Sequence, residues 1–480
     1  MEETFDIIVV GAGLAGIIAS YRLQTMLPSK RFVVLEARAC MGGTWDIFKY
    51  PGIRSDSDLT TYGFVFEPWS QDRQIASGSQ IFNYIKETAG KHGIDQKIRL
   101  NHRVSRASWS SEEGRWRLDV LADGVEKVMY AKYTMWASGY YDQNRGLNPE
   151  ILGLGDFKGN LIHPQFWPEG LDYTDKRVII IGSGATAITL VPAMATAAKH
   201  VTMLQRSPSY LLVIPTNARE DQILKRYLPA SMASRLIRWK YLLIPRLVTE
   251  LCKYFPGFIR SGMRKLTSSL LPSHIPHDPH FEPRYNMGEQ RICLTPDGDF
   301  FKALHTSKVS IFTDTIKTVT STGIELASGS RLEADIIVNA TGLKIQLFGG
   351  AQIVVDGEPI KINDKYAWHG TMLQDVPNAC LLIGYTSTSW TLGVDIMSQL
   401  NIRLLRMMDE RGATKMTPRV DPTKPLNPAP LLDISSTYVK VAANYTPKAG
   451  DRGPWKRRAG YYEDFLKVKF GNLTRELVFE

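Results

Sequence analysis

Two glycine-rich loops in this chain of 480 residues have the composition and spacing that bind a pyrophosphate. The first loop is Gly11-Ala12-Gly13-Leu14-Ala15-Gly16, and the second is Gly182-Ser183-Gly184-Ala185-Thr186-Ala187. Glycines at this spacing allow a tight turn and a close approach of the backbone to phosphate, and the following helix adds free N–H groups and its positive dipole end. Two such loops predict two nucleotides, and a chain that holds two nucleotides usually moves electrons between them.

The residue at the end of the strand after each loop distinguishes the two nucleotides. Glu36 lies twenty positions after Gly16, where a carboxylate accepts hydrogen bonds from ribose hydroxyls and disfavours a 2′-phosphate. The first loop is therefore predicted to bind FAD or NAD. Arg206, followed by Ser207, takes the corresponding place after the second loop, and a guanidinium there pairs with a 2′-phosphate, which indicates NADP.

The elements that must position these loops are strands and helices of an α/β fold. Each loop follows a short β-branched run, typical of a buried parallel strand, and opens a segment with helical spacing. We expect two Rossmann-like dinucleotide-binding domains. The first comprises residues 1–145 together with 380–480, a linker spans 146–176, and the second comprises 177–379 with a helical insertion at about 220–275.

Charge is unevenly placed along the chain, whose formal net charge is +10. The segment 222–265 holds ten Lys or Arg residues and one acid, Glu250, which gives it a net charge of +9. Its basic and apolar residues alternate at roughly helical spacing. The favoured interpretation is a helical excursion that packs on the core and turns its basic side to water. The alternative is a helix that lies on an anionic membrane. No nucleic-acid motif accompanies the charge, so no nucleic-acid partner is expected.

The cysteines and the hydropathy pattern bound the compartment. The four cysteines are far apart and include no CxxC pair, so neither a redox dithiol nor a metal site is expected, and a reducing compartment is favoured. The pattern shows no secretory signal and no apolar run long enough to span a bilayer. We therefore expect a cytoplasmic protein, with peripheral membrane association through 222–265 as the alternative.

Two further motifs carry a resemblance to a known family. The segment 157–168 matches the pattern FxGxxxHxxxW(P/D), and the segment 42–56 matches GGxWxxxxYPGxxxD. With both glycine loops in the right order, the chain resembles the type I Baeyer–Villiger monooxygenases over nearly its whole length. The runs 289–293 with 296–299, and 384–386 with 389–391, are similar to the ethionamide-activating branch of that family.

This resemblance implies an enzyme that uses FAD, NADPH and molecular oxygen on a small-molecule ketone or sulfur substrate. In the family, a flavin C4a-peroxide delivers the oxygen. Its deprotonated form inserts oxygen beside a ketone carbonyl to give an ester or lactone, and its protonated form oxidises thioether or thiocarbonyl sulfur. The sequence leaves both activities open.

The resemblance also implies catalytic roles for two residues. Arg291 is expected to be the cation that stabilises the anionic species during oxygen transfer. Asp56 is expected to orient that arginine and the nicotinamide. It could also cap a helix, because Ser55-Asp56-Ser57-Asp58 is a good capping sequence, and both roles can hold at once. The linker histidine, His163, is expected to help domain motion rather than chemistry, or to be a satisfied linker residue. Gln290 stands where many relatives have a lysine, so preference for NADPH is expected to depend on Arg206.

Other cofactor-binding residues are expected near these motifs. Besides the two loops, Glu36, Asp56, Arg206 and Ser207, the expected residues are Thr44, Trp45, Asp46, Ile47, Arg54, Ser55 and Val104.

Three other classes of function share part of this sequence pattern. An N- or S-hydroxylating flavin monooxygenase shares both glycine loops but lacks the Phe and the closing Trp of the linker motif. A disulfide reductase needs the CxxC pair that this chain lacks. A catalytically silent, membrane-docked NADP-binding protein would be favoured by the loss of Arg291 or Asp56, and both residues are present.

Overall fold

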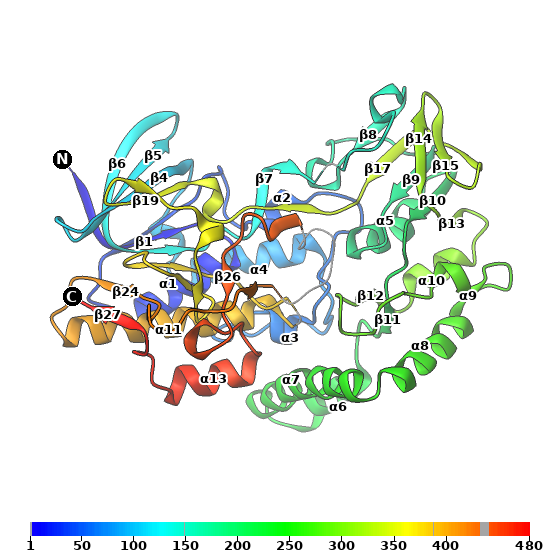
Figure 1. Ribbon diagram of the computed structural model, residues 1–480. Helices are drawn as coiled ribbons and strands as arrows, with labels where there is room; N and C mark the ends of the chain where they lie inside the picture. Colours follow the sequence, from blue (N-terminus) through cyan, green and yellow to red (C-terminus); the bar gives the residue numbers. More distant parts are fainter. Residues whose placement is uncertain (1, 148, 387, 433–440) are drawn as a thin grey trace. The chain divides into compact units, whose positions relative to one another are not determined.

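The computed structural model describes residues 2–147, 149–386, 388–432 and 441–480. The chain forms two compact units, each assembled from separate segments (Figure 1). Unit 1 comprises residues 1–46, 81–144 and 344–480, and unit 2 comprises residues 47–80 and 145–343. The predicted α/β fold with two Rossmann-like domains is confirmed.

Unit 1 is built on one large mixed sheet. Its strands are β1 (Glu3–Val10), β2 (Phe32–Leu35), β3 (Ile98–Arg99), β4 (His102–Ser110), β5 (Arg115–Ala122), β6 (Val125–Trp136), β19 (Gln352–Val355), β20 (Glu358–Pro359) and β23 (Ala379–Leu381). They pair in the order β20-β19-β4-β5-β6-β1-β2-β3, and β23 pairs with β6. The pairs of β1 with β2 and β6 are parallel, as a nucleotide-binding half requires, while β4, β5 and β6 form an antiparallel extension.

The helices of unit 1 cover this sheet. They include α1 (Leu14–Met26), α4 (Gly78–Lys91, most of which belongs to unit 1), α11 (Trp390–Glu410) and α13 (Tyr461–Phe470). Helix α1 packs on α11, and α11 packs on α13. Three fully buried tryptophans, Trp109, Trp116 and Trp136, fill the core over the antiparallel extension. Smaller pairs complete the unit: β21 (Ala367–Trp368) with β22 (Met372–Leu373), β24 (Met416–Pro418) with β27 (Leu477–Phe479), and β25 (Ala429–Pro430) with β26 (Lys448–Ala449).

Unit 2 contains a second, all-parallel sheet. Its strand order is β13 (Val309–Thr313), β10 (His200–Gln205), β9 (Arg177–Ile181), β17 (Ile336–Asn339) and β8 (Asn160–Ile162). Helix α5 (Ala185–Ala195) follows β9 directly. A three-stranded antiparallel sheet of β14 (Ile316–Thr320), β15 (Gly323–Leu326) and β16 (Arg331–Glu333) connects β13 to β17, and β11 (Leu211–Ile214) pairs with β12 (Cys293–Pro296).

The helical insertion is where the sequence predicts it. It contains α6 (Arg219–Tyr227), α7 (Ala230–Tyr254), α8 (Pro256–Leu270) and α9 (His277–His280), between β11 and β12. The expectation that it packs on the core is met by Ala233, Ile237 and Cys252, which are buried. Its basic side, however, is not the only part that faces water, because many large apolar side chains of α7 and α8 are exposed as well. Within the described ranges, no helix is both long enough and apolar enough to cross a bilayer.

The predicted domain boundaries differ from the observed units in three places. Residues 47–80 group with unit 2 rather than with the first domain, and unit 1 resumes at residue 344 rather than 380. The second difference arises because β19 pairs in parallel with β4 and so extends the sheet of unit 1. The segment 146–176 is more than a linker, since β8 lies within it and forms an edge strand of the second sheet.

Candidate cofactor and active sites

The first glycine loop of unit 1 has the close backbone packing that its glycines predict. Gly11 has a φ of +107°, and a Cβ atom there would lie 2.6 Å from the carbonyl oxygen of Ala137. A Cβ on Gly16 would lie 1.9 Å from the carbonyl oxygen of Gly11. Gly13 precedes α1 as its N-terminal capping residue, and Ala15 is buried in the first turn of the helix. Only glycine fits at positions 11 and 16, so the loop is shaped to bring backbone N–H groups to a ligand.

Glu36 fastens this loop from the end of β2. Its Oε2 accepts a hydrogen bond from the backbone N–H of Ala12 at 2.8 Å, and Oε1 accepts one from the N–H of Arg38 at 3.0 Å. Burial raises the pKa of Glu36, and the two backbone hydrogen bonds act in the opposite direction. A carboxylate has about four acceptor positions. It can therefore hold the loop and still accept hydrogen bonds from ribose hydroxyls.

The first part of the second signature lies against the same loop. Gly43 has a φ of +56°, and a Cβ there would lie 3.1 Å from Cα of Gly13. The N–H of Gly42 donates to the carbonyl of Ala12 at 3.0 Å. The short helix α2 (Thr44–Ile47) follows, with Trp45 buried and Asp46 paired to Arg38 at 2.5 Å. Thr44, Trp45 and Asp46 are thus held beside the predicted dinucleotide cradle, and Ile47 is the first residue of unit 2.

Two further residues of unit 1 bear on the fit of a dinucleotide. Ser138, directly after the strand end that packs on Gly11, has a buried Oγ atom with no hydrogen-bond partner in the described structure. A buried hydroxyl in that state is a position that a polar ligand would satisfy. The side chain of Val104 packs in the hydrophobic core, so a cofactor contact from this residue would have to come from its backbone. The buried Glu36, the glycine cradle and Ser138 together fit an adenine dinucleotide such as FAD.

The second glycine loop, in unit 2, repeats this geometry. Gly182 has a φ of +138°, and a Cβ there would lie 2.4 Å from the carbonyl oxygen of Ala340. Gly184 caps α5, and a Cβ there would meet no atom within 4 Å, so the N-terminus of the helix is open on that side. The Oγ of Ser183 donates to the carbonyl of Ser207 at 2.8 Å, which ties the loop to the end of β10. Ala185, Thr186 and Ala187 form the first turn of α5.

Arg206 lies where the sequence places it, directly after β10. The residue is exposed, and Ser207 beside it is half-buried. A guanidinium at the strand end, next to an open helix N-terminus, fits a nucleotide that carries a 2′-phosphate. The residues of this loop therefore fit NADP(H).

The YPG turn of the second signature packs on α5, a contact that the sequence pattern does not indicate. The pKa of Tyr50 is raised to about 12 by burial, while its hydroxyl is hydrogen-bonded to Thr186. Gly52 has a φ of +75°, and a Cβ there would lie 2.8 Å from Cβ of Ala193. The turn is therefore pressed against the helix that carries the second glycine loop. The Tyr-Pro-Gly pattern signalled a turn but not its partner.

Asp56 and Arg291 form an ion pair in unit 2. Nη2 of Arg291 donates to Oδ1 of Asp56 at 2.7 Å, and the side chains are 40% and 34% exposed. Cys293, two residues further along the chain, is fully buried, and its Sγ lies 3.9 Å from the carbonyl of Ser183 in the second glycine loop. Burial raises the pKa of Cys293 to about 12; Asp56 also raises it, whereas Arg291 lowers it. The ion pair thus lies close to the predicted NADP site.

The capping role belongs to Asp58 rather than to Asp56. Oδ1 of Asp58 accepts from the N–H of Thr61 at 2.8 Å at the start of α3 (Leu59–Tyr62). Burial raises the pKa of Asp58 to about 6, although Thr61 and the nearby Arg238 lower it. The Asp56 carboxylate therefore does not cap α3 and instead pairs with Arg291. The capping alternative for Asp56 is wrong, because the helix starts two residues later.

The two residues before Asp56 differ in what their side chains contact. Arg54 forms a bidentate ion pair with Asp299, a partner that the sequence analysis did not identify. Ser55 is buried, and its Oγ has no hydrogen-bond partner within the described residues. The segment 54–56 is consequently fixed on both sides, which favours a positioning role for Arg54 over direct cofactor contact.

The linker motif wraps around the edge of the second sheet. Phe157 packs in a core cluster with Ile179 and Ile337, whereas Trp167 packs against the cluster that contains Ile180 and Val338. Neighbouring residues of a strand, such as Ile179 and Ile180, face opposite sides of a sheet. Phe157 and Trp167 therefore pack on opposite faces of the second sheet. Between them, β8 pairs with β17. Trp167 and Phe157 therefore both act as hydrophobic anchors of the linker motif, with Phe157 fully inside a core cluster.

His163 lies beside two of the segments through which the chain passes between the units, one that enters unit 2 and one that leaves it. Its Nδ1 accepts from the N–H of Gln165 at 3.2 Å, so Nε2 carries the proton and donates to the carbonyl of Gly342 at 3.3 Å. A Cβ on Gly146 would lie 2.4 Å from Nε2. Gly146 ends β7 (Tyr141–Gly146), and Gly342 precedes β18 (Leu343–Ile345), with which β7 pairs. Burial lowers the pKa of His163, which favours the neutral ring.

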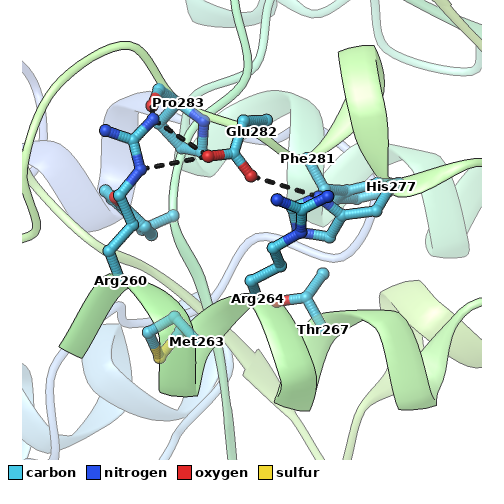
Figure 2. A pocket seen from close by; sticks show the side chains of 9 residues that line it. Arg260, Met263, Arg264, Thr267, His277, Phe281, Glu282 and Pro283 are labelled. Carbon is cyan, nitrogen blue, oxygen red and sulfur yellow. Dashed lines mark hydrogen bonds and ion pairs between the residues drawn. The ribbon is translucent and has the colours of Figure 1, made fainter. Parts of the chain in front are cut away.

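A separate hollow in unit 2 is lined by residues from α8, α9 and the segment after α9 (Figure 2). Glu282 accepts from Nε of Arg260 at 3.0 Å, and its other oxygen lies 3.3 Å from Nδ1 of His277. Nη2 of Arg260 also donates to the carbonyl of Pro283 at 3.0 Å. These contacts hold α8 against Glu282 and Pro283, which follow α9. Within the described ranges, no group of three or more His, Cys, Asp or Glu side chains is arranged to hold a metal ion.

Comparisons with known proteins agree with this geometry. The profile of the pyridine nucleotide-disulphide oxidoreductases matches residues 8–212. The FAD-containing monooxygenase EthA of Mycolicibacterium smegmatis is 43% identical over 99% of this chain and 97% of its own length. The chain belongs to the EthA-type FAD-containing monooxygenases. The probable FAD-binding monooxygenase AlmA of an Acinetobacter species is 40% identical over 98% of this chain and 95% of its own length. A structure of OTEMO in complex with FAD and NADP shares the fold, with a TM-score of 0.74, 19% identity and full coverage of both chains.

Family membership confirms the resemblance to the type I Baeyer–Villiger monooxygenases, and this monooxygenase is an enzyme of the flavoprotein class. The disulfide reductase alternative is wrong. All four cysteines lie in the described part of the chain, and none of them pairs in a disulfide. Of the predicted site residues, the structure brings together Asp56 and Arg291 in unit 2, and Glu36 with the first glycine loop in unit 1.

Proposed function

We propose that this FAD-dependent monooxygenase inserts one atom of molecular oxygen beside the carbonyl of a ketone and also oxidises thioether or thiocarbonyl sulfur. The ion pair between Asp56 and Arg291 is the observation that carries the proposal. A guanidinium held by a carboxylate, near a nucleotide-binding loop, can stabilise negative charge on a substrate oxygen.

The two cofactors would be held by separate residues of the chain. The first glycine loop with Glu36 and Ser138 would bind FAD, and the second loop with Arg206 and Ser207 would bind NADPH. When bound, FAD supplies oxygen activation at the expense of electrons from NADPH. The buried Tyr50 and the glycine turn beside it would hold the N-terminus of α5 in place for the NADPH phosphates.

Arg291 and Asp56 would have different roles in oxygen transfer to the substrate. Attack on a ketone carbonyl leaves negative charge on the carbonyl oxygen, and the Arg291 guanidinium would stabilise that charge. Asp56 would keep the guanidinium in one orientation, because the Nη2–Oδ1 contact of 2.7 Å is a charge-assisted hydrogen bond. Oxidation of neutral sulfur forms no such oxyanion, so it would depend less on Arg291.

Oxygen-18 labelling tests the proposal directly. The FAD-loaded protein, NADPH and ¹⁸O₂ are incubated with a panel of ketones and thioethers, and the products are identified by mass spectrometry. We expect esters and sulfoxides that each carry one labelled oxygen, with NADPH consumed in proportion. NADPH consumption that yields only hydrogen peroxide with every substrate would contradict the proposed oxygen transfer.

A further inference from the structure

The outer side of α7 carries a continuous apolar stripe. Seven of its side chains are each between 39% and 67% exposed and recur every three or four residues: Met232, Leu236, Trp239, Leu243, Leu247, Leu251 and Tyr254. Residues at this spacing share one face of a helix. The buried residues Ala233, Ile237 and Cys252 form a different stripe, so the helix packs on unit 2 with one apolar face and exposes a second.

The turn from α7 to α8 extends this exposed surface. Tyr254, Phe255 and Phe258 are 67%, 59% and 80% exposed, around Pro256 and Gly257. Single exposed apolar residues are common on protein surfaces, but a contiguous set of large ones marks a surface that binds something. We call the seven side chains of the α7 stripe, together with Phe255 and Phe258, the outer face.

Basic residues border the outer face. Arg235, Arg246 and Lys253 are separated by eleven and seven residues, which places them in one row along α7. On the helical wheel this row lies beside the exposed stripe, on the side away from the buried one. Lys265 on α8 is exposed as well. Arg246 is paired with Glu250 of the same helix at 3.2 Å, and the other members of the row, together with Lys265, leave the border of the outer face basic. This border is complementary to an anionic surface.

Other polar residues of the same helices point inward and hold them on unit 2. Nη1 of Arg238 donates to the carbonyl of Thr60 at 2.6 Å, and the hydroxyl of Tyr241 donates to Asp221 at 2.9 Å. Lys240 also pairs with Asp221, and Arg260 of α8 is tied to Glu282 (Figure 2). The helices are therefore fixed from the inside, so the outer face is not needed to secure them and is available to a partner.

We propose that the outer face docks on an anionic phospholipid bilayer, with α7 lying in the plane of the headgroups. Aromatic and aliphatic side chains would enter the boundary of the acyl chains, while the basic row contacts the lipid phosphates. Docking a second copy through the same face is disfavoured, because it would bring two rows of exposed basic residues together. The proposal rests on the helices alone and is independent of the proposed chemistry.

Vesicle flotation with the full-length, FAD-loaded protein tests this proposal. We expect binding to vesicles of mixed phosphatidylglycerol and phosphatidylcholine, little binding to pure phosphatidylcholine, and a marked decrease at high salt. The double variant Phe255→Ser/Phe258→Ser should weaken binding by about tenfold or more, because two rings no longer leave water. Lys253→Glu/Lys265→Glu should also weaken binding by about tenfold or more.

Matched variants outside the outer face control for general effects. Leu152→Ser removes an apolar side chain that is 74% exposed, and Lys127→Glu reverses an exposed charge on β6. Both should bind vesicles as the original protein does. Bound flavin, measured by absorbance, reports that each variant is folded. The proposal is overturned if the protein ignores anionic vesicles, if the Phe variant binds as well as the original, or if sedimentation shows self-association through this face without vesicle binding.

Discussion

Replacing Arg291 by alanine should separate oxygen transfer from stability and from cofactor binding. The contact to Asp56 is 2.7 Å long, but the two side chains are 40% and 34% exposed. An ion pair at that exposure contributes about 0–1 kcal/mol to folding, so the variant should fold and retain FAD. Loss of a group that stabilises an oxyanion typically costs about 2.7–4 kcal/mol, which is a hundred- to a thousandfold in rate.

The assay compares three quantities in one preparation: flavin reduction by NADPH in stopped flow, the yield of ester from a ketone, and the yield of sulfoxide from a thioether. We expect some flavin reduction to persist, ester formation to fall to near background, and sulfoxidation to fall less. NADPH electrons should then appear as free hydrogen peroxide. Arg291→Lys keeps the charge but loses the planar fork, so it should recover only part of the ester yield.

Two outcomes would refute this reasoning. Full ester formation in Arg291→Ala would show that no oxyanion depends on this guanidinium. Loss of bound FAD in the same variant would make Arg291 a structural residue. Asp56→Asn provides the second arm, because it leaves the arginine in place and removes the charge-assisted contact that orients it.

Three further predictions concern the nucleotide loop, the cap of α3 and the YPG turn. Arg206→Ala should reduce the use of NADPH by about ten- to a hundredfold more than the use of NADH, measured as kcat/KM for each coenzyme, and equal effects would exclude a 2′-phosphate contact. Burial raises the pKa of Asp58 from 3.8 to about 6, so the folded state holds its proton more tightly than the unfolded state, and this group lowers stability as the pH rises through that window. Asp58→Asn should therefore become more stable relative to the original protein by up to about 3 kcal/mol between pH 4 and pH 7 in denaturant titrations, and a constant difference would contradict the burial argument. Gly52→Ala should destabilise the protein by more than Gly93→Ala, since both have positive φ but only the Cβ at residue 52 meets a neighbour, at 2.8 Å; equal losses would show that backbone strain alone is responsible.

The sequence predicts the parts of the site that depend on local backbone geometry. Gly11 and Gly182 were identified because a tight turn between strand and helix needs glycine, and both have the expected positive φ. Glu36 could be predicted from its distance along the chain, because it lies twenty positions after Gly16 at the end of the following strand. Its hydrogen bond to Ala12 joins residues of one strand–helix–strand unit.

Contacts between distant segments could not be predicted from the residues alone. Asp56 and Arg291 are 235 positions apart, and only the family resemblance suggested that they pair. The packing of Gly52 on α5 and the pairing of Arg54 with Asp299 depend on how segment 47–80 folds into unit 2. The boundary near residue 344 could not be predicted because β19 has only four residues, which is too short for a periodic signal of its own.

The helical insertion shows a different limit. Basic and apolar residues alternate through segment 222–265, and the sequence pattern alone could not separate the stripe that packs from the stripe that is exposed. Both are apolar and both have helical spacing. Only the buried positions of Ala233, Ile237 and Cys252 distinguish them.

The way in which the chain alternates between its two units bears on how the protein folds during synthesis. Every residue of unit 2 has been made once residue 343 has left the ribosome, whereas unit 1 still lacks residues 344–480. Those residues supply β19 and β23 to its sheet and α11 against α1. The N-terminal strand and its glycine loop must therefore wait for the end of the chain, and unit 2 can close first. A ribosome-bound chain that stops near residue 343 should show protease-resistant unit 2 segments beside an exposed N-terminus, the reverse of the usual N-to-C order of domain folding.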